Sequence, residues 1–239
     1  DLVGDLVAVV HALGETQAVV VGHDWGAPVA WHAALLRPDV FRAVAGLSMP
    51  FQPRKVGKEP IPTLREICEK GDLGTFYVVA FQEPGAEDAF DRDPELALRK
   101  AFYAYDGATP DTERSTGFYR SDDWLGSMAT PPRLPPWMSE EELAVYVRAF
   151  REGGFFGPIA WYRNIDRNHR LMRHAQERRI VVPGLFVVGD RDPVRGYVGA
   201  AEIGLKRWVP DLRGRVVVPG AGHWIQQERP DAVLDALLP

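Results

Sequence analysis

The chain has 239 residues, of which 46% are hydrophobic and 26% are charged, and its formal net charge is −5. This length suffices for one large domain, or for a core that carries an inserted lid. The basic residues are scattered rather than gathered into a stripe, so we expect no nucleic-acid partner. No run of about 18 consecutive apolar residues occurs, so we expect no membrane span.

Cys68 is the only cysteine, so the chain can form neither an intramolecular disulfide nor a cysteine-based metal site. A single cysteine fits a reducing compartment, and we therefore predict a cytoplasmic protein. The chain begins at Asp1 rather than at Met, so an upstream targeting peptide would not be visible in it. The oligomeric state is left open, and a dimer is compatible with the sequence.

The first 38 residues predict a helix, a strand, a tight turn and a second helix. Segment 1–13 has apolar residues at helical spacing and is followed by Gly14, which predicts a helix that stops there. The predicted apolar face of this helix is Leu2, Leu6, Val9, Val10 and Leu13. The continuous apolar run at 18–21 predicts a strand that is buried on both faces. The segment from Ala27 to about Pro38 predicts the second helix.

The rest of the chain predicts an interrupted parallel sheet. Residues 53–178 are punctuated by prolines, rich in aromatic residues and mostly helical in pattern. Within them, Ser139 followed by three glutamates predicts a capping box that opens a helix through Phe150. Further strands are predicted at 43–48, 184–188 and 215–218, with a last helix from about Pro230. We therefore predict an α/β fold with core segments 1–52 and 179–239 and a helical cap at 53–178.

Gly22-x-Asp24-x-Gly26 has the form of a nucleophile elbow, with Asp in the place of the usual Ser. We expect the two glycines to remove side chains that would clash in this turn. The turn places Asp24 at a helix N-terminus, where the ionised form is favoured. The alternative is an ordinary strand-to-helix turn with Asp24 as the N-cap. The apolar strand before the motif and the apolar helix after it favour the elbow.

A carboxylate nucleophile suits attack on saturated carbon, such as the carbon of an epoxide or a carbon that bears a halogen. The product is an ester of Asp24, and its hydrolysis requires a general base. His223 follows a predicted strand and a turn of small residues, and Asp192 follows the preceding strand. The order nucleophile, acid, base is that of α/β-hydrolases. Asp192 is expected to orient the imidazole, with Asp190 as the competing candidate.

Several motifs together resemble those of the α/β-hydrolase-fold epoxide hydrolases. They are Gly-His-Asp-Trp-Gly-Ala at 22–27, Gly-His-Trp at 222–224, Phe-Gln-Glu-Pro-Gly at 81–85, and Gly-Pro at 157–158 followed by Trp-Tyr-Arg-Asn at 161–164. The likeness extends over nearly the whole chain. It implies an α/β-hydrolase fold with an inserted helical cap, and hydrolysis of a small apolar epoxide by water to a vicinal diol. It implies neither a cofactor nor a metal.

The resemblance also implies roles for residues that the pattern alone would not single out. In that family two cap tyrosines bind the epoxide oxygen, and the matching residues are Tyr77 and Tyr162. Without the resemblance both would be interpreted as ordinary packing tyrosines. The backbone N–H of Trp25 is expected to be an oxyanion-hole donor and its indole a pocket wall. Trp161 and His23 are expected to contact the substrate.

The chain departs from the family pattern before its first predicted helix. Members of the family carry opening strands and a His-Gly-x-Pro loop there, and no His-Gly pair precedes Asp24. The strand at 18–21 would then be an exposed apolar edge. Loss of one oxyanion-hole donor costs about 10²–10³ in rate. We therefore expect the chain as given to be weakly active or inactive.

Two other functions remain compatible with these residues. A haloalkane dehalogenase would use the same Asp24, Asp192 and His223, with halide-binding N–H donors in place of the tyrosine pair. A non-catalytic hydrolase-like protein would bind a small apolar ligand without turning it over. The identity of the epoxide and the regio- and enantioselectivity are not encoded in any pattern that we recognise.

Overall fold

The computed structural model describes residues 1–54, 56–120 and 123–238. The chain divides into two compact units. The core unit comprises residues 1–55 and 175–239, and the cap unit comprises residues 56–174. The sequence places the corresponding boundaries at residues 53 and 178, where the buried-strand pattern stops and resumes.

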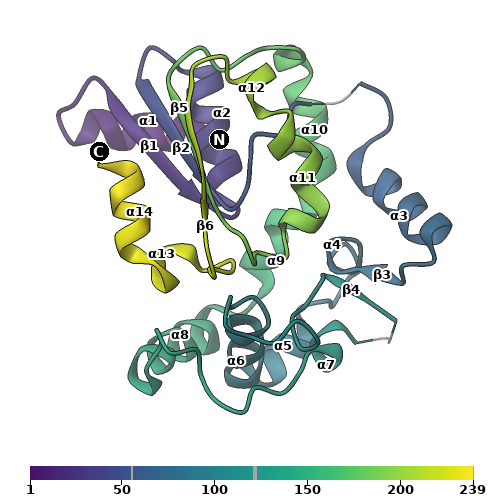
Figure 1. Cartoon of the computed structure of the whole chain (residues 1–239). Coiled ribbons are helices and arrows are strands. Elements are labelled where there is room, and N and C mark those ends of the chain that lie inside the picture. The colour runs from purple at the N-terminus through teal and green to yellow at the C-terminus, as the bar shows by residue number, and fades with distance from the viewer. Residues whose placement is uncertain (55, 121–122, 239) are drawn as a thin grey trace. The chain divides into compact units, whose positions relative to one another are not determined.

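The core unit is built on a sheet of four parallel strands in the order β1-β2-β5-β6 (Figure 1). The strands are β1 (Ala18–His23), β2 (Phe41–Leu47), β5 (Gly184–Gly189) and β6 (Leu212–Val218). The helices are α1 (Leu2–Ala12), α2 (Gly26–Leu36), α11 (Arg195–Ile203), α12 (Leu205–Trp208), α13 (Ile225–Glu228) and α14 (Pro230–Leu237). The predicted α/β fold with a parallel sheet is therefore confirmed.

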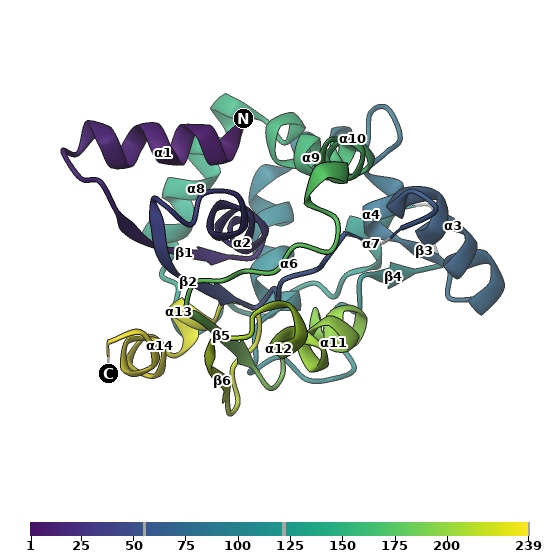
Figure 2. The ribbon, with the colours of Figure 1, turned by 90° about the horizontal axis from the view of Figure 1, so that it is seen from above.

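Helices cover both faces of this sheet, as Figure 2 shows for α2 and α14. One core cluster joins α1 and α2 to the start of β2 through residues such as Val10, Ala33 and Phe41. A second cluster joins Leu47 and Val187 of the sheet to the helices that follow β6. β1 and β2 end at the paired residues His23 and Leu47, and β5 and β6 end at the paired residues Gly189 and Val218, so all four loops leave the same edge of the sheet.

The first helix forms as predicted, and its predicted apolar face is correct for Leu6 and Val10 but wrong for the other three residues. The residues that pack against α2 and β2 are Val3, Leu6, Val7 and Val10. Three members of the predicted face are exposed instead: Leu2 (47%), Val9 (54%) and Leu13 (74%). Both sets follow helical spacing, and the position of α2 decides which one is buried. The stop at Gly14 is confirmed, because this glycine has a φ of +80°, in the left-handed region.

The first strand also forms as predicted, but it is not buried on both faces. Val20 packs against the α1 side of the sheet, whereas Val19 and Val21 on the opposite face are each 48% exposed. Among the described strands β1 pairs with β2 alone, so it lies at an edge of the sheet. The prediction of burial on both faces is therefore wrong, whereas the expectation of an exposed apolar edge at 18–21 is confirmed for the described sheet.

A buried tryptophan fixes α2 against the sheet. The Trp31 side chain is fully buried and lies over Gly46 of β2, where a Cβ atom would come within 2.4 Å of Trp31 Nε1. The indole N–H donates a hydrogen bond of 3.0 Å to the backbone oxygen of Met49. A notch at Gly46 therefore receives the indole and sets the distance between α2 and β2.

The cap unit is mainly helical. Its helices are α3 (Pro60–Gly71), α4 (Tyr77–Ala80), α5 (Asp88–Arg92), α6 (Pro94–Ala104), α7 (Trp124–Ser127), α8 (Glu140–Gly153), α9 (Phe156–Arg163) and α10 (Ile165–Leu171). Two short antiparallel strands, β3 (Thr75–Phe76) and β4 (Phe118–Tyr119), pair within it. A 3-10 helix, η1 (Met172–Ala175), follows α10. The capping box predicted at Ser139 is confirmed, with both reciprocal hydrogen bonds to Glu142 present.

Within the parts of the chain that the structure describes, none of the helices combines the length and the apolar character needed to cross a membrane.

Candidate active site

The turn between β1 and α2 is strained at its centre. Asp24 has a φ of +47°, in the left-handed region that a residue with a Cβ atom adopts at a cost. A Cβ atom at Gly22 would lie 2.1 Å from the backbone oxygen of Gly26, so only glycine fits there. The same reason does not apply to Gly26, where an added Cβ meets nothing within 4 Å. The clash argument is therefore correct for the first glycine of the motif and wrong for the second.

The carboxylate of Asp24 is held by two contacts. Its Oδ2 accepts a hydrogen bond of 2.6 Å from the backbone N–H of Trp25, and its Oδ1 lies 3.2 Å from Nε2 of His223. The N-cap of α2 is Trp25, so Asp24 lies one residue before the cap position. The alternative that Asp24 is an ordinary N-cap is therefore wrong. The Asp24 side chain remains 36% exposed, so its carboxylate is accessible.

The imidazole of His223 lies between two carboxylates. Its Nε2 faces Asp24, and its Nδ1 lies 3.2 Å from Oδ2 and 3.3 Å from Oδ1 of Asp192. The Asp192 side chain is fully buried and accepts a second hydrogen bond of 2.9 Å from the N–H of Val194. Asp190, the competing candidate, accepts instead from the N–H of Gly220 at 2.7 Å. Of these two aspartates, Asp192 is the one placed at the imidazole.

The loop after β6 brings His223 back toward β1. It crosses the end of β5 so closely that a Cβ atom at Gly189 would lie 2.2 Å from the backbone oxygen of Ala221. The N–H of Arg191 donates to the same oxygen at 3.0 Å. These backbone contacts explain how residues that follow β1, β5 and β6 meet at one edge of the sheet.

The charges in this arrangement support one another. Burial opposes ionisation of Asp24, but the hydrogen bond and the charge of His223 outweigh it and lower the pKa of the carboxyl. Burial also opposes protonation of His223, yet the charge and hydrogen bond of Asp192, together with those of Asp24, raise its pKa to about 10. Both neighbouring carboxylates therefore favour the protonated form of the His223 imidazole.

His23 is held in a different state from its neighbour. Burial lowers the pKa of its imidazole to about 4, and repulsion by the charged His223 acts in the same direction. The two rings lie 4.8 Å apart between centroids. His23 is thus neutral at pH 7, and its Nε2 lies 2.7 Å from the backbone oxygen of His223. One polar atom of this predicted substrate-contacting residue is therefore engaged by the protein itself.

The structure also reveals residues that the sequence analysis missed. Glu228 accepts hydrogen bonds from the backbone N–H groups of Gly222 and Trp224, which flank His223. The hydroxyl of Ser48, at the end of β2, donates to the backbone oxygen of His223 at 3.2 Å. The only indication of Glu228 in the sequence is its position five residues after the predicted base. This position alone does not predict its role, because the course of the loop at 222–224 is needed to place the carboxylate beside it.

The cap unit brings the two predicted tyrosines together. The rings of Tyr77, at the start of α4, and Tyr162, in α9, lie edge to face with centroids 5.5 Å apart. Phe81 contacts both rings, at 5.5 Å and 4.9 Å. Trp124 stacks on Tyr77 at 4.8 Å with an interplanar angle of 15°. The two phenols therefore belong to one aromatic cluster.

Hydrogen bonds tie the two cap motifs to each other. The side-chain amide of Gln82 donates to the backbone oxygen of Tyr162 at 3.1 Å. Arg163 donates to the backbone oxygens of Phe81 and Glu83, each at 3.0 Å. It also pairs with Glu87 at 2.6 Å, and this hydrogen bond lowers the pKa of the Glu87 carboxyl. The motif residues beside the tyrosines thus fix the spacing of α4 and α9. Trp161, which precedes Tyr162, is 36% exposed.

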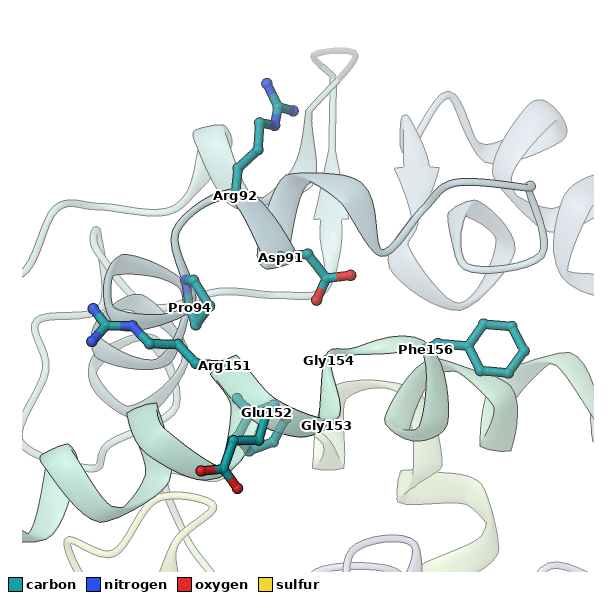
Figure 3. Close-up of a pocket in the computed structure, with 9 residues that line it drawn as sticks. Asp91, Arg92, Pro94, Arg151, Glu152, Gly153, Gly154 and Phe156 are labelled. Atoms are coloured by element: carbon teal, nitrogen blue, oxygen red, sulfur yellow. The ribbon is translucent and has the colours of Figure 1, made fainter.

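A separate hollow of about 590 Å³ lies in the cap unit between the ends of α5 and α8 (Figure 3). Its lining is Asp91, Arg92, Pro94, Phe150, Arg151, Glu152, Gly153, Gly154 and Phe156. None of the predicted site residues lines it. Arg92 and Phe156 extend away from it in Figure 3, and Asp91 already accepts a hydrogen bond from the N–H of Phe155 at 2.9 Å.

The sequence was compared with protein families and with curated proteins. The alpha/beta hydrolase family model matches residues 1–236. The chain is 38% identical to "Epoxide hydrolase A" of Mycobacterium tuberculosis, over 99% of this chain and 72% of that protein. It is 37% identical to "Epoxide hydrolase 2" of Siraitia grosvenorii, over 96% of this chain and 71% of that protein.

Solved structures give the same result. An epoxide hydrolase from an endophytic Streptomyces superposes with a TM-score of 0.92 at 38% identity, over 98% of this chain and 71% of that chain. Epoxide Hydrolase A from Mycobacterium thermoresistibile superposes with a TM-score of 0.87, also at 38% identity, over 98% and 72% of the two chains. The chain therefore belongs to the alpha/beta hydrolase family and, within that family, to the epoxide hydrolases.

Proposed function

We propose that this chain hydrolyses an epoxide to a vicinal diol in two steps, through a covalent ester on Asp24. The observation that carries the proposal is the placement of one accessible carboxylate between an amide donor and a buried imidazole. The amide is the N–H of Trp25, and the imidazole is that of His223, which is backed by Asp192. The names of the relatives support the same reaction.

In the first step Asp24 attacks a carbon of the epoxide ring. Its Oδ2 is held by the Trp25 N–H at 2.6 Å, whereas Oδ1 has the longer contact, 3.2 Å to Nε2 of His223, so we assign Oδ1 as the attacking atom. A new bond forms between Oδ1 and carbon while the bond from carbon to the ring oxygen breaks. That oxygen takes a proton from Tyr77 or Tyr162, because an alkoxide is a poor leaving group without a donor. Proton exchange with solvent then restores the phenol.

The second step depends on a change in charge. Formation of the ester removes the negative charge of Asp24, which raises the pKa of His223 in addition to the larger effect of Asp192. Its loss lowers the pKa of His223, and in the proposed step the imidazole releases its proton to solvent. Neutral His223 can then accept a proton from the water that attacks the ester carbonyl. Asp192 stabilises the imidazolium that forms.

During breakdown of the ester, negative charge develops on the carbonyl oxygen and is stabilised by the elbow. Oδ2 becomes the oxyanion, and the Trp25 N–H that already lies 2.6 Å from it is the donor that stabilises it. Collapse of this intermediate breaks the bond between the carbonyl carbon and Oδ1, and the departing oxygen takes the proton from His223, which releases the diol. The second proton of the water leaves the Asp24 carboxyl for His223, which restores the starting pair. The oxygen of the water remains in the carboxylate of Asp24.

Single turnover in heavy-oxygen water tests this sequence of steps. With the chain in excess over epoxide, we expect the label in the peptide that contains Asp24 and not in the diol. Asp24→Asn should give no label and no diol. Label that enters the diol directly would contradict the ester. A haloalkane should be assayed in parallel, since halide release without diol formation would identify a dehalogenase instead.

A further inference from the structure

One carboxylate spans the backbone on both sides of the proposed base. Oε2 of Glu228 accepts from the N–H of Gly222 at 2.8 Å, and Oε1 accepts from the N–H of Trp224 at 3.0 Å. Glu228 is buried, with 9% exposed, and it ends the short helix α13. Each oxygen thus fixes one of the two peptide groups adjacent to His223.

The carbonyl between these two peptide groups is fixed as well. The backbone oxygen of His223 lies 2.7 Å from Nε2 of His23 and accepts from the hydroxyl of Ser48 at 3.2 Å. Ser48 is fully buried, and His23 is neutral at pH 7 because burial lowers its pKa. Side chains from three segments therefore hold the main chain of the base.

The contacts of the imidazole itself are long. Nδ1 lies 3.2 Å and 3.3 Å from the oxygens of Asp192, and Nε2 lies 3.2 Å from Oδ1 of Asp24, at or just beyond the upper end of the range for N–H···O hydrogen bonds. The position of Nε2 therefore depends on the main chain of His223. A shift of the loop at 222–224 would move Nε2 relative to the water that it must activate.

We propose that Glu228 is a positioning residue for the second step, because it clamps the loop that carries His223. This inference rests on the proposed function of His223 as the base. Attack of Asp24 on the epoxide uses a carboxylate that is already ionised, so the first step does not need His223 at a fixed point. Hydrolysis of the ester does need the imidazole at a fixed point. A displacement of a catalytic group by about 1 Å costs about a hundredfold in rate.

A simpler alternative is that Glu228 only caps α13. Its bond to the N–H of Trp224 has that form, since Trp224 is the N-cap of this helix. Capping alone would lower stability and reduce both steps by the same factor, through the fraction of folded protein. Loss of the positioning role would instead slow ester breakdown much more than ester formation.

The test uses Glu228→Gln, which keeps the volume of the side chain but turns an N–H₂ group toward one of the two amides. Glu202→Gln is the matched control, because Glu202 is also a buried carboxylate (4% exposed) but pairs with Arg195 and Arg215. Rapid quenching and mass analysis of the Asp24 peptide give the rates of ester formation and breakdown. The folded fraction of each variant is measured by circular dichroism.

For Glu228→Gln we expect ester formation within about twofold of the unchanged chain and ester breakdown slower by about ten- to a hundredfold. The ester should therefore accumulate. Glu202→Gln should change neither rate once corrected for the folded fraction. Equal losses in both steps of Glu228→Gln, or no loss at all in a folded variant, would overturn the proposal.

A second readout separates this inference from the proposed function. The imidazole NMR signals of His223 should shift in Glu228→Gln and not in Glu202→Gln, whether or not an ester forms. If the unchanged chain forms no ester, the proposed function fails while this spectrum still reports on the clamp. Signals of His223 that are identical in both variants would show that Glu228 does not position the ring.

Discussion

Nε2 of His223 lies 3.2 Å from Oδ1 of Asp24, so the proposed nucleophile and the proposed base are in contact before substrate arrives. Each group stabilises the charged form of the other. The contact favours the ionised form of Asp24, which attacks, and it adds to the effect of Asp192 in favouring the protonated form of His223, which cannot act as a base. The following predictions separate these two effects.

Replacement of Asp24 by Asn should abolish turnover without destroying the turn. Asn tolerates the left-handed conformation that Asp24 adopts at φ +47°, so the elbow should be kept. We expect diol formation to fall by about 10⁴-fold or more. Diol is measured by chromatography, and circular dichroism checks the fold. A folded variant that still made diol at a tenth of the original rate would remove Asp24 from the mechanism.

The same substitution should lower the pKa of His223. The negative charge of Asp24 favours the imidazolium, so its removal must shift the titration downward from about 10. Histidine NMR signals recorded across the pH range report this directly. By the same argument, the rate of ester hydrolysis should rise with pH until the imidazole of the ester form is neutral. A titration of His223 that is unchanged in Asp24→Asn would contradict the coupling.

Replacement of His223 by Gln should stop the reaction halfway. Asp24 needs no base to attack, whereas the water in the second step does, and general base catalysis is worth about 10²–10⁴-fold. We therefore expect the ester on Asp24 to form and persist, visible as an increase in the mass of the protein by the mass of the epoxide. Absence of any adduct in a folded variant would show that His223 is needed earlier than proposed.

Removal of either phenol should slow ester formation rather than its breakdown. Tyr77→Phe and Tyr162→Phe each remove a proton donor, and we expect about a hundredfold loss in the first step. The control is Tyr103→Phe, since Tyr103 is a buried cap tyrosine that donates to Glu113 at 2.5 Å. Rapid-quench rates distinguish the two steps. Equal effects of all three substitutions would assign the tyrosines to packing alone.

The two glycines of the elbow should respond differently to alanine. A methyl group at Gly22 would lie 2.1 Å from a backbone oxygen, which cannot move away without displacing α2. We expect Gly22→Ala to lower the free energy of unfolding by about 3 kcal/mol. Gly26→Ala adds a methyl group in open space and should be tolerated. Denaturant unfolding of the two variants makes the comparison, and equal stabilities would contradict the clash.

The sequence predicted the parts of the site that follow buried strands. Asp24, Asp192 and His223 were found because each lies three to five residues after the end of an apolar run, where the loops after parallel strands meet at one edge of the sheet. Glu228 was not found, because a glutamate in the polar segment after His223 looks like a solvated residue. Only the course of the loop back over Gly189 shows that its carboxylate is buried against that loop.

Predictions from periodicity alone were less secure. In α1, two overlapping sets of residues satisfy helical spacing, and packing against α2 selected the one with Val3 and Val7. In β1, a run of valines predicted burial on both faces, yet the strand lies at the edge of the described sheet with Val19 and Val21 half exposed. In both elements the outcome depended on which neighbours are present, and local sequence does not encode this.

The notch at Gly46 that receives Trp31 limits how this enzyme can be redesigned. The helix that follows the nucleophile is closely packed. Trp31 fills the notch, and the side chains of Ala27, Ala30 and Ala33 are buried, with 1% or less of their surface exposed. A larger residue on that face would tilt α2 and carry the attacking oxygen with it. Libraries aimed at new substrates should therefore leave this face unchanged and vary residues that do not pack against α2 or the elbow.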